Sequence, residues 1–103
     1  MAMTEVTKET FEAEVLKAES LVLADFNADW CGPCKSMRPM LEELAEARPE
    51  IKIVSINIDE EDELTDEYDV ISIPCLVVFK NGEEVNRSVG LISRDAIAEL
   101  VEG

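Results

Sequence analysis

A short apolar run in the first third of the chain limits the fold more than any other feature. Residues Leu21–Phe26 (LVLADF) are apolar except for one aspartate. A strand that is apolar on both alternating sides is buried on both faces, inside a sheet that carries helices on each side. A second run rich in β-branched residues, Ile51–Ile58 (IKIVSINI), has the same character. The sequence therefore predicts an α/β fold.

Amphipathic spacing predicts the helices that cover this sheet. Apolar residues recur at helical intervals over Lys8–Glu19 and over Lys35–Ala47, where Pro39 is expected to bend the axis. An acidic stretch, Glu60–Tyr68, predicts a third helix. A fourth is expected from the capping residue Ser93 to about Glu102.

A hairpin signal completes the order of elements. Asn81-Gly82 lies between two strand-like runs, Cys75–Lys80 and Glu83–Val89, and this dipeptide strongly favours a tight turn. The expected order is β-α-β-α-β-α-β-β-α, a central mixed five-stranded sheet flanked by four helices. We found no linker or repeat, so residues 1–103 are expected to form a single domain.

Composition excludes several classes of function. The 103 residues include 24 acidic and 9 basic side chains, giving a formal net charge of −15. Nucleic acids and anionic membranes require clustered Lys or Arg, so neither is expected as a partner. Histidine is absent, which excludes Ser-His and Cys-His nucleophile pairs and His-ligated metals. No run approaches the roughly 20 apolar residues of a membrane span, and no signal peptide is recognised, so a cytoplasmic location is expected.

The cysteine pattern points to redox chemistry. Cys31, Cys34 and Cys75 are an odd number for a disulfide scaffold, and they lack the second close pair that an all-cysteine zinc site needs. A Cys-x-x-Cys pair then suggests a redox dithiol, placed where a buried strand ends and a helix begins. The partial positive charge of a helix N-terminus favours a thiolate. We expect Cys31, at the exposed end, to attack, and the more shielded Cys34 to resolve.

A family resemblance covers essentially the whole chain. The segment Trp30–Lys35 (WCGPCK) is the active-site sequence of the thioredoxins. Asp25-Phe26 precedes it at the family spacing, and Ile73-Pro74 lies where the family carries a cis-proline. Phe79–Gly82, followed by Gly90, matches the family's closing hairpin. The chain thus resembles the thioredoxin family, which implies a thioredoxin fold.

The resemblance also implies an activity. A thioredoxin acts as a protein-disulfide reductase and electron carrier, in which Cys31 attacks a substrate disulfide and Cys34 releases the reduced product. The Cys31–Cys34 disulfide is then reduced by a separate flavoenzyme, thioredoxin reductase, usually drawing on NADPH. The partners expected are this reductase and disulfide-containing proteins. No bound cofactor or metal is expected, and the chain is expected to be a monomer.

The resemblance assigns further site residues. Asp25 corresponds to the buried acid that acts on the Cys34 proton, and burial alone would raise the pKa of an aspartate within an apolar strand. The residues expected to contact substrate are Trp30, Gly32, Pro33, Ile73 and Pro74.

Four positions depart from the family pattern. Ser55 stands where many thioredoxins have a lysine near the buried acid, which predicts a pKa for Asp25 higher than in those relatives. Asn27 replaces an aromatic residue and is expected to thin the packing beneath the site. The negative charge of Asp29 should oppose thiolate formation at Cys31. Cys75 replaces a threonine, and is either a regulatory third thiol or a small buried strand residue.

Three other functions stay open at this point. A disulfide isomerase or oxidant would use the same chemistry in another direction, and the reduction potential distinguishes it. A redox-silent binding subunit would keep its effect after Cys31→Ser. An Fe–S or zinc carrier would use Cys31, Cys34 and Cys75, and a metal-free preparation would exclude it.

Overall fold

The predicted apolar run forms the central strand of the sheet. This strand, β2 (Val22–Asn27), is parallel to β3 (Lys52–Asn57), which is in turn parallel to β1 (Met3–Glu5). On its other side β2 is antiparallel to β4 (Cys75–Lys80), which forms a hairpin with β5 (Glu83–Val89). The computed structural model describes residues 3–102, and its five strands lie in the order β1-β3-β2-β4-β5. The expected mixed sheet is confirmed.

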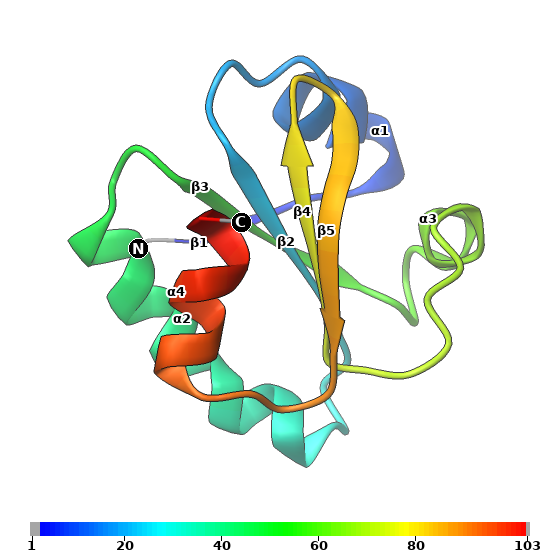
Figure 1. Cartoon of the computed structure of the whole chain (residues 1–103). Coiled ribbons are helices and arrows are strands. Elements are labelled where there is room, and N and C mark those ends of the chain that lie inside the picture. Colours follow the sequence, from blue (N-terminus) through cyan, green and yellow to red (C-terminus); the bar gives the residue numbers. More distant parts are fainter. Residues whose placement is uncertain (1–2, 103) are drawn as a thin grey trace.

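Helices cover both faces of the sheet (Figure 1). One face carries α2 (Gly32–Ala47) and α4 (Arg94–Glu102). The other carries α1 (Lys8–Phe11), the π-helical segment η1 (Glu12–Leu16) that continues it, and α3 (Asp62–Glu67). The expected α/β architecture is therefore present over the part of the chain that the structure describes.

Alternation along β2 divides the core in two. Leu23 packs in the apolar cluster that contains Met37 and Leu41 of α2, whereas Phe26 packs in the cluster of Phe11 and Leu64. Residues two apart on a strand face the same side. Asp25 and Asn27 therefore lie on the α2 side of the sheet.

The first predicted helix is shorter than expected. The pattern predicted one helix over Lys8–Glu19, but α1 changes to π-helical geometry and ends at Leu16. The Lys17 N–H donates to Glu12 O at 2.8 Å, a bond across five residues. The turn between β4 and β5 lies against this end, since a Cβ on Gly82 would come within 2.9 Å of Leu16 O. Local periodicity does not reveal such a tertiary contact.

The other boundaries fall close to the predicted ones. Both hairpin strands have the predicted bounds, and Asn81 and Gly82 take positive φ angles of 54° and 81°, as the turn requires. Helix α2 starts at Gly32 rather than Lys35, so the Cys-x-x-Cys segment forms its first turn.

No helix within residues 3–102 is long and apolar enough to span a bilayer.

Candidate active site

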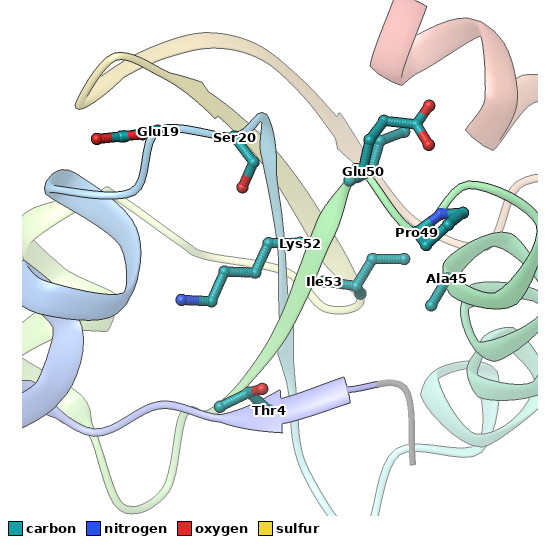
Figure 2. A pocket seen from close by; sticks show the side chains of 9 residues that line it. Thr4, Glu19, Ser20, Ala45, Pro49, Glu50, Lys52 and Ile53 are labelled. Carbon is teal, nitrogen blue, oxygen red and sulfur yellow. The ribbon is translucent and has the colours of Figure 1, made fainter.

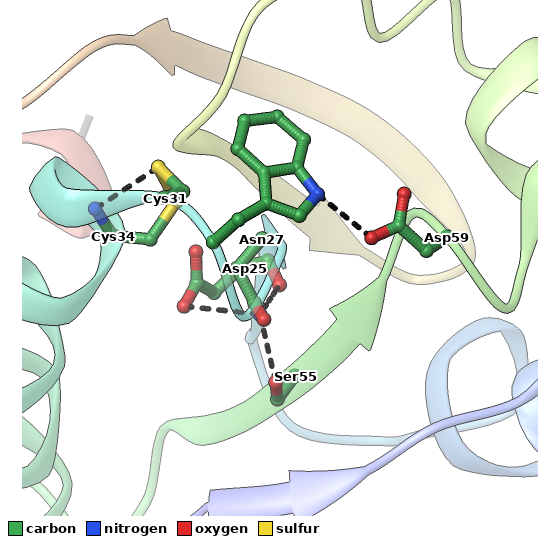
Figure 3. The surroundings of a disulfide bond; sticks show 7 residues. Asp25, Asn27, Cys31, Cys34, Ser55 and Asp59 are labelled. Carbon is green, nitrogen blue, oxygen red and sulfur yellow. Dashed lines mark hydrogen bonds between the residues drawn. A yellow bond between two sulfur atoms is a disulfide. The ribbon is translucent and has the colours of Figure 1, made fainter.

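The first turn of α2 brings the two sulfurs together. Cys31 is the N-cap, with extended backbone angles (φ −90°, ψ 109°), and Pro33 lies in the first turn, where a missing N–H is tolerated. The Cys34 backbone N–H donates to Cys31 Sγ at 3.2 Å. The Cα atoms of Cys31 and Cys34 are 5.3 Å apart, and the pair is joined in a disulfide (Figure 3).

The two cysteines are equally buried, which corrects one expectation. We expected Cys31 at an exposed end and Cys34 shielded, but each is only 5% exposed in this oxidised form. Both pack with Ala28, and Ile58 and Ile73 cover the same cluster. Because the Cys31 sulfur turns back over the first helical turn to accept the Cys34 N–H, it does not project into solvent.

Trp30 is the large exposed side chain beside the disulfide. Its side chain is 68% exposed, yet its Nε1–H donates a 2.8 Å hydrogen bond to Asp59 Oδ2 in the loop after β3 (Figure 3). The Asp59 backbone N–H donates to Asn57 Oδ1 at 2.8 Å, which fixes that loop in turn. The indole therefore has a defined orientation.

The loop before β4 also contacts the cysteine pair. The Ile73–Pro74 peptide bond is cis, and Ile73 packs against the cluster that holds both cysteines. The Gly90 N–H donates to Pro74 O at 2.8 Å, joining this loop to the end of β5. Gly32 and Pro33 are exposed.

Asp25 is buried on the same side of the sheet as α2. It is 2% exposed, and its neighbour across the parallel pair is Ser55 of β3. Burial raises the pKa of Asp25 to about 7, against the smaller lowering effects of the Arg38 charge and of a hydrogen bond from Asn27. Its Oδ1 has no hydrogen-bond partner within residues 3–102. Whether this pKa exceeds that of lysine-bearing relatives stays a prediction.

Asn27 has a role that the sequence interpretation missed. We expected it to thin the packing, but its Nδ2 donates to the Asp25 backbone O at 2.9 Å and to Ser55 Oγ at 2.8 Å. A signal was present in the sequence, because residues 25 and 27 share one strand face. The resemblance had placed Ser55 near Asp25, but the hydrogen bond from Asn27 to Ser55 was not foreseen.

A hollow of about 260 Å³ opens next to Cys34. It is lined by Asn27, Ala28, Asp29, Cys34, Lys35 and Arg38. The resolving cysteine candidate Cys34 and Asn27 of β2 therefore border the same hollow. A wider hollow of about 670 Å³ lies at the amino end of β3, beside Lys52 and Ile53 (Figure 2). That one is remote from the cysteines, because the disulfide follows the opposite, carboxyl end of β2.

Cys75 lies on the other face of the sheet. It is 1% exposed and packs in the cluster of Phe26 and Val77, on the α1 and α3 side. Burial raises the pKa of its thiol. Among the residues that the structure describes, no group of three or more Cys, Asp or Glu side chains is arranged to hold a metal ion.

The disulfide lies at the N-terminus of a helix, next to a cis-proline loop, and the strand before it carries a buried carboxyl group. A cysteine pair held in this way can exchange its disulfide with that of another protein, which defines the class of thiol–disulfide oxidoreductases. Comparison with known proteins gives the family. The thioredoxin sequence model matches residues 2–103. Thioredoxin from Bacillus subtilis (strain 168) is 49% identical over 102 residues, covering 98% of this chain and 96% of that one. The chain belongs to the thioredoxin family.

Other relatives agree along nearly the whole length. Thioredoxin from Chlamydia trachomatis is 45% identical over 96 residues, covering 93% of this chain and 92% of the other. The solved structure of a mutant thioredoxin from Halobacterium salinarum NRC-1 superposes with a TM-score of 0.89 at 40% identity, covering 97% of this chain and 88% of that one. The protein is a protein-disulfide reductase that uses its cysteine pair as the redox centre. Disulfide-containing proteins and a reductase are its general classes of partner.

Proposed function

We propose that Cys31 is the attacking nucleophile and Cys34 the resolving thiol. The Cys31 thiolate attacks one sulfur of a substrate disulfide, forms a mixed disulfide and releases the other substrate sulfur as a thiolate. The Cys34 thiolate then attacks Cys31 Sγ, which releases the second substrate thiolate and leaves the Cys31–Cys34 disulfide. The substrate gains two electrons and the cysteine pair loses two. The observation that carries this assignment is the Cys34 N–H at 3.2 Å from Cys31 Sγ, because a donor there stabilises a negative sulfur.

Asp25 is the proposed base for the second step. A carboxyl group with a pKa near 7 accepts a proton at neutral pH without binding it too tightly. Asn27, which contacts Asp25, and Cys34 line the same hollow, which supports a role for Asp25 at this cysteine. The proton of the Cys34 thiol moves to the Asp25 carboxylate as the Cys34 sulfur attacks.

The proposed substrate surface comprises Trp30, Gly32, Pro33, Ile73 and Pro74. It combines the exposed indole, the exposed Gly32–Pro33 pair and the half-buried Ile73, whose backbone is held by the buried cis-Pro74. Cys75 is proposed to be a core residue rather than a regulatory thiol, since it is buried on the opposite face of the sheet.

The family supports four finer biological proposals. We expect one domain over residues 1–103, acting as a monomer in the cytoplasm and recharged by a flavoenzyme thioredoxin reductase that usually draws on NADPH. The net charge of −15 favours a reductase with a positively charged docking surface.

The reduction potential of the Cys31–Cys34 couple tests the direction of the reaction. Equilibration in defined glutathione or dithiothreitol buffers should give a value well below the glutathione poise. A value near or above that poise would instead assign the protein to oxidation or isomerisation. Cys34→Ser should accumulate a mixed disulfide with substrate, and Cys31→Ser should form none. The opposite pattern would reverse the two roles.

A further inference from the structure

A buried polar cluster of three side chains lies between β2 and β3, on the side of α2 (Figure 3). Asn27 Nδ2 donates to Ser55 Oγ at 2.8 Å and to the Asp25 backbone O at 2.9 Å, and lies 3.5 Å from Asp25 Oδ2. A side-chain amide has only two N–H groups. Three acceptors therefore share two donors, and the carboxyl oxygen has the longest contact.

The Asp25 carboxyl has few other polar neighbours. Its Oδ1 is buried and has no hydrogen-bond partner in the described part of the chain, and Leu76, opposite it on β4, is apolar. The charged group that acts on it is Arg38 of α2, whose positive charge lowers the pKa of Asp25, and Asp25 in turn raises the pKa of Cys75 on β4. An isolated buried carboxylate is strongly disfavoured. Asn27 is thus the side chain that donates a hydrogen bond to the carboxyl of Asp25.

Asn27 also borders the place where Asp25 would act. It lines the hollow of about 260 Å³ next to Cys34, together with Arg38. One side chain therefore contacts the carboxyl group on one side and faces the space beside the resolving cysteine on the other.

We propose that Asn27 is a positioning residue for the reduction. One N–H of its side-chain amide donates a hydrogen bond to Ser55 Oγ while Asp25 is protonated, and donates to Asp25 Oδ2 instead when Asp25 is ionised. Before the proton transfer Asp25 is a carboxylate, and the amide donates to it. After Asp25 has accepted the proton of the Cys34 thiol, the N–H returns to Ser55. Ser55 competes for this donor, so it acts on Asp25 through Asn27. The inference rests on the proposed role of Asp25 as the base.

Two substitutions that each remove the hydrogen bond between Asn27 and Ser55 should then shift the pKa of Asp25 in opposite directions. Asn27→Ala removes the donor to the carboxylate and should raise the pKa of Asp25. Ser55→Ala removes only the competing acceptor, leaves the N–H to Asp25 and should lower that pKa. If the cluster were merely structural, both variants would lose the hydrogen bond between Asn27 and Ser55, with no reason for opposite effects on the pKa of Asp25.

The direct measurement is an NMR pH titration of the Asp25 carboxyl carbon in the oxidised full-length protein. We expect the midpoint to move up in Asn27→Ala and down in Ser55→Ala, each by about 0.5 to 1 pH unit. Shifts of the same sign, or none in either variant, would overturn the inference. If Asn27→Ala does not fold, Ser55→Ala alone decides, since an upward or absent shift contradicts the proposal.

A kinetic measurement separates this inference from the role of Asp25. The pH dependence of the release of the second substrate thiol should shift with the NMR midpoint in both variants. Asp25→Asn should slow this step and remove its dependence on the carboxyl group. If Asp25→Asn changes neither rate nor profile, the proposed base is wrong. If it changes both while the Asn27 and Ser55 variants shift nothing, only the positioning role is wrong.

Discussion

The Trp30 indole N–H donates a hydrogen bond of 2.8 Å to Asp59 Oδ2, although the ring itself is mostly exposed. Trp30 precedes the cysteine pair and Asp59 follows β3, so the bond links two loops at the carboxyl edge of the parallel strands. An exposed indole without a partner would sample several rotamers. The contact therefore reduces the conformational entropy that Trp30 loses when a substrate covers it.

Asp59→Ala should weaken the reduction of protein disulfides, because it frees the indole. We expect kcat/KM to fall by about fivefold, the equivalent of one ordinary hydrogen bond. The chain has one tryptophan, so fluorescence anisotropy reports its mobility directly. Asp59→Asn keeps an acceptor oxygen and serves as the control. It should change both kcat/KM and the mobility of the indole less than Asp59→Ala does. Increased mobility with unchanged kcat/KM would show that indole orientation does not matter to substrate.

Gly82→Ala should destabilise the protein more than Gly90→Ala. Both glycines have positive φ angles, 81° and 95°, so each alanine carries backbone strain of about 1–2 kcal/mol. Only at Gly82 would the new Cβ also meet a backbone atom, Leu16 O at 2.9 Å; at Gly90 nothing lies within 4 Å. Urea unfolding should show an additional loss of about 1 kcal/mol or more for Gly82→Ala. Equal losses would mean that η1 moves away freely.

The sequence was most informative about the sheet. The hairpin strands Cys75–Lys80 and Glu83–Val89 were predicted with their observed bounds, because Asn81-Gly82 marks the turn locally. The register shift between Val78 and Phe79 was not predicted. The first helix was less predictable, since the π-helical geometry that ends at Leu16 accompanies a contact with the Gly82 turn, which is distant in sequence.

The parts of the candidate site that depend on neighbouring residues in the sequence were predictable. The placement of Cys31 and Cys34 at the start of a helix followed from the order of the elements. Their equal burial did not, since it depends on Ile58 and Ile73, which come from two other loops. The resemblance placed Ser55 near Asp25, but the hydrogen bond between Asn27 and Ser55 was missed, because Asn27 was considered only as a replacement for an aromatic residue.

Cys75 should be unreactive in the folded oxidised protein. It is 1% exposed and burial raises its pKa, so both access and thiolate content are low. Thiol titration should detect no reactive cysteine in native oxidised protein and one in denaturant. Cys75→Ala should leave the rate of disulfide reduction and the sensitivity to oxidants unchanged. Rapid native labelling, or protection from oxidants in the variant, would instead support a regulatory thiol.

The surplus of negative charge should make stability depend on salt. Within residues 3–102, seven of the nine basic side chains form ion pairs, and the net charge of −15 is what remains after all nine are counted. Glu67 ends α3, where a negative charge opposes the helix dipole. Glu67→Gln should raise the free energy of unfolding by about 0.3–1 kcal/mol at low salt, an effect that NaCl at about 1 M removes. Asp62→Asn, in the first turn of α3, should not stabilise at all.

Burial of Asp25 should make the protein less stable as the pH rises. Its carboxyl has a pKa of about 7 in the folded protein and an ordinary 3.8 when exposed, so between these values the folded state binds more protons than the unfolded one. The corresponding stability is complete below pH 3.8 and is lost progressively up to about pH 7. Asp25→Asn carries no charge at any pH and avoids this loss.

The free energy of unfolding of Asp25→Asn, relative to the parent protein, should therefore increase by about 3 kcal/mol between about pH 5 and pH 8. Chemical denaturation at both pH values measures the change, and the exposed Asp62→Asn controls for the loss of one carboxylate. Because the parent and the variant share every other titrating group, a difference that stays constant over this range would mean that Asp25 is ionised in the folded state throughout. In that case the carboxylate would be too acidic to accept the proton of the Cys34 thiol at neutral pH.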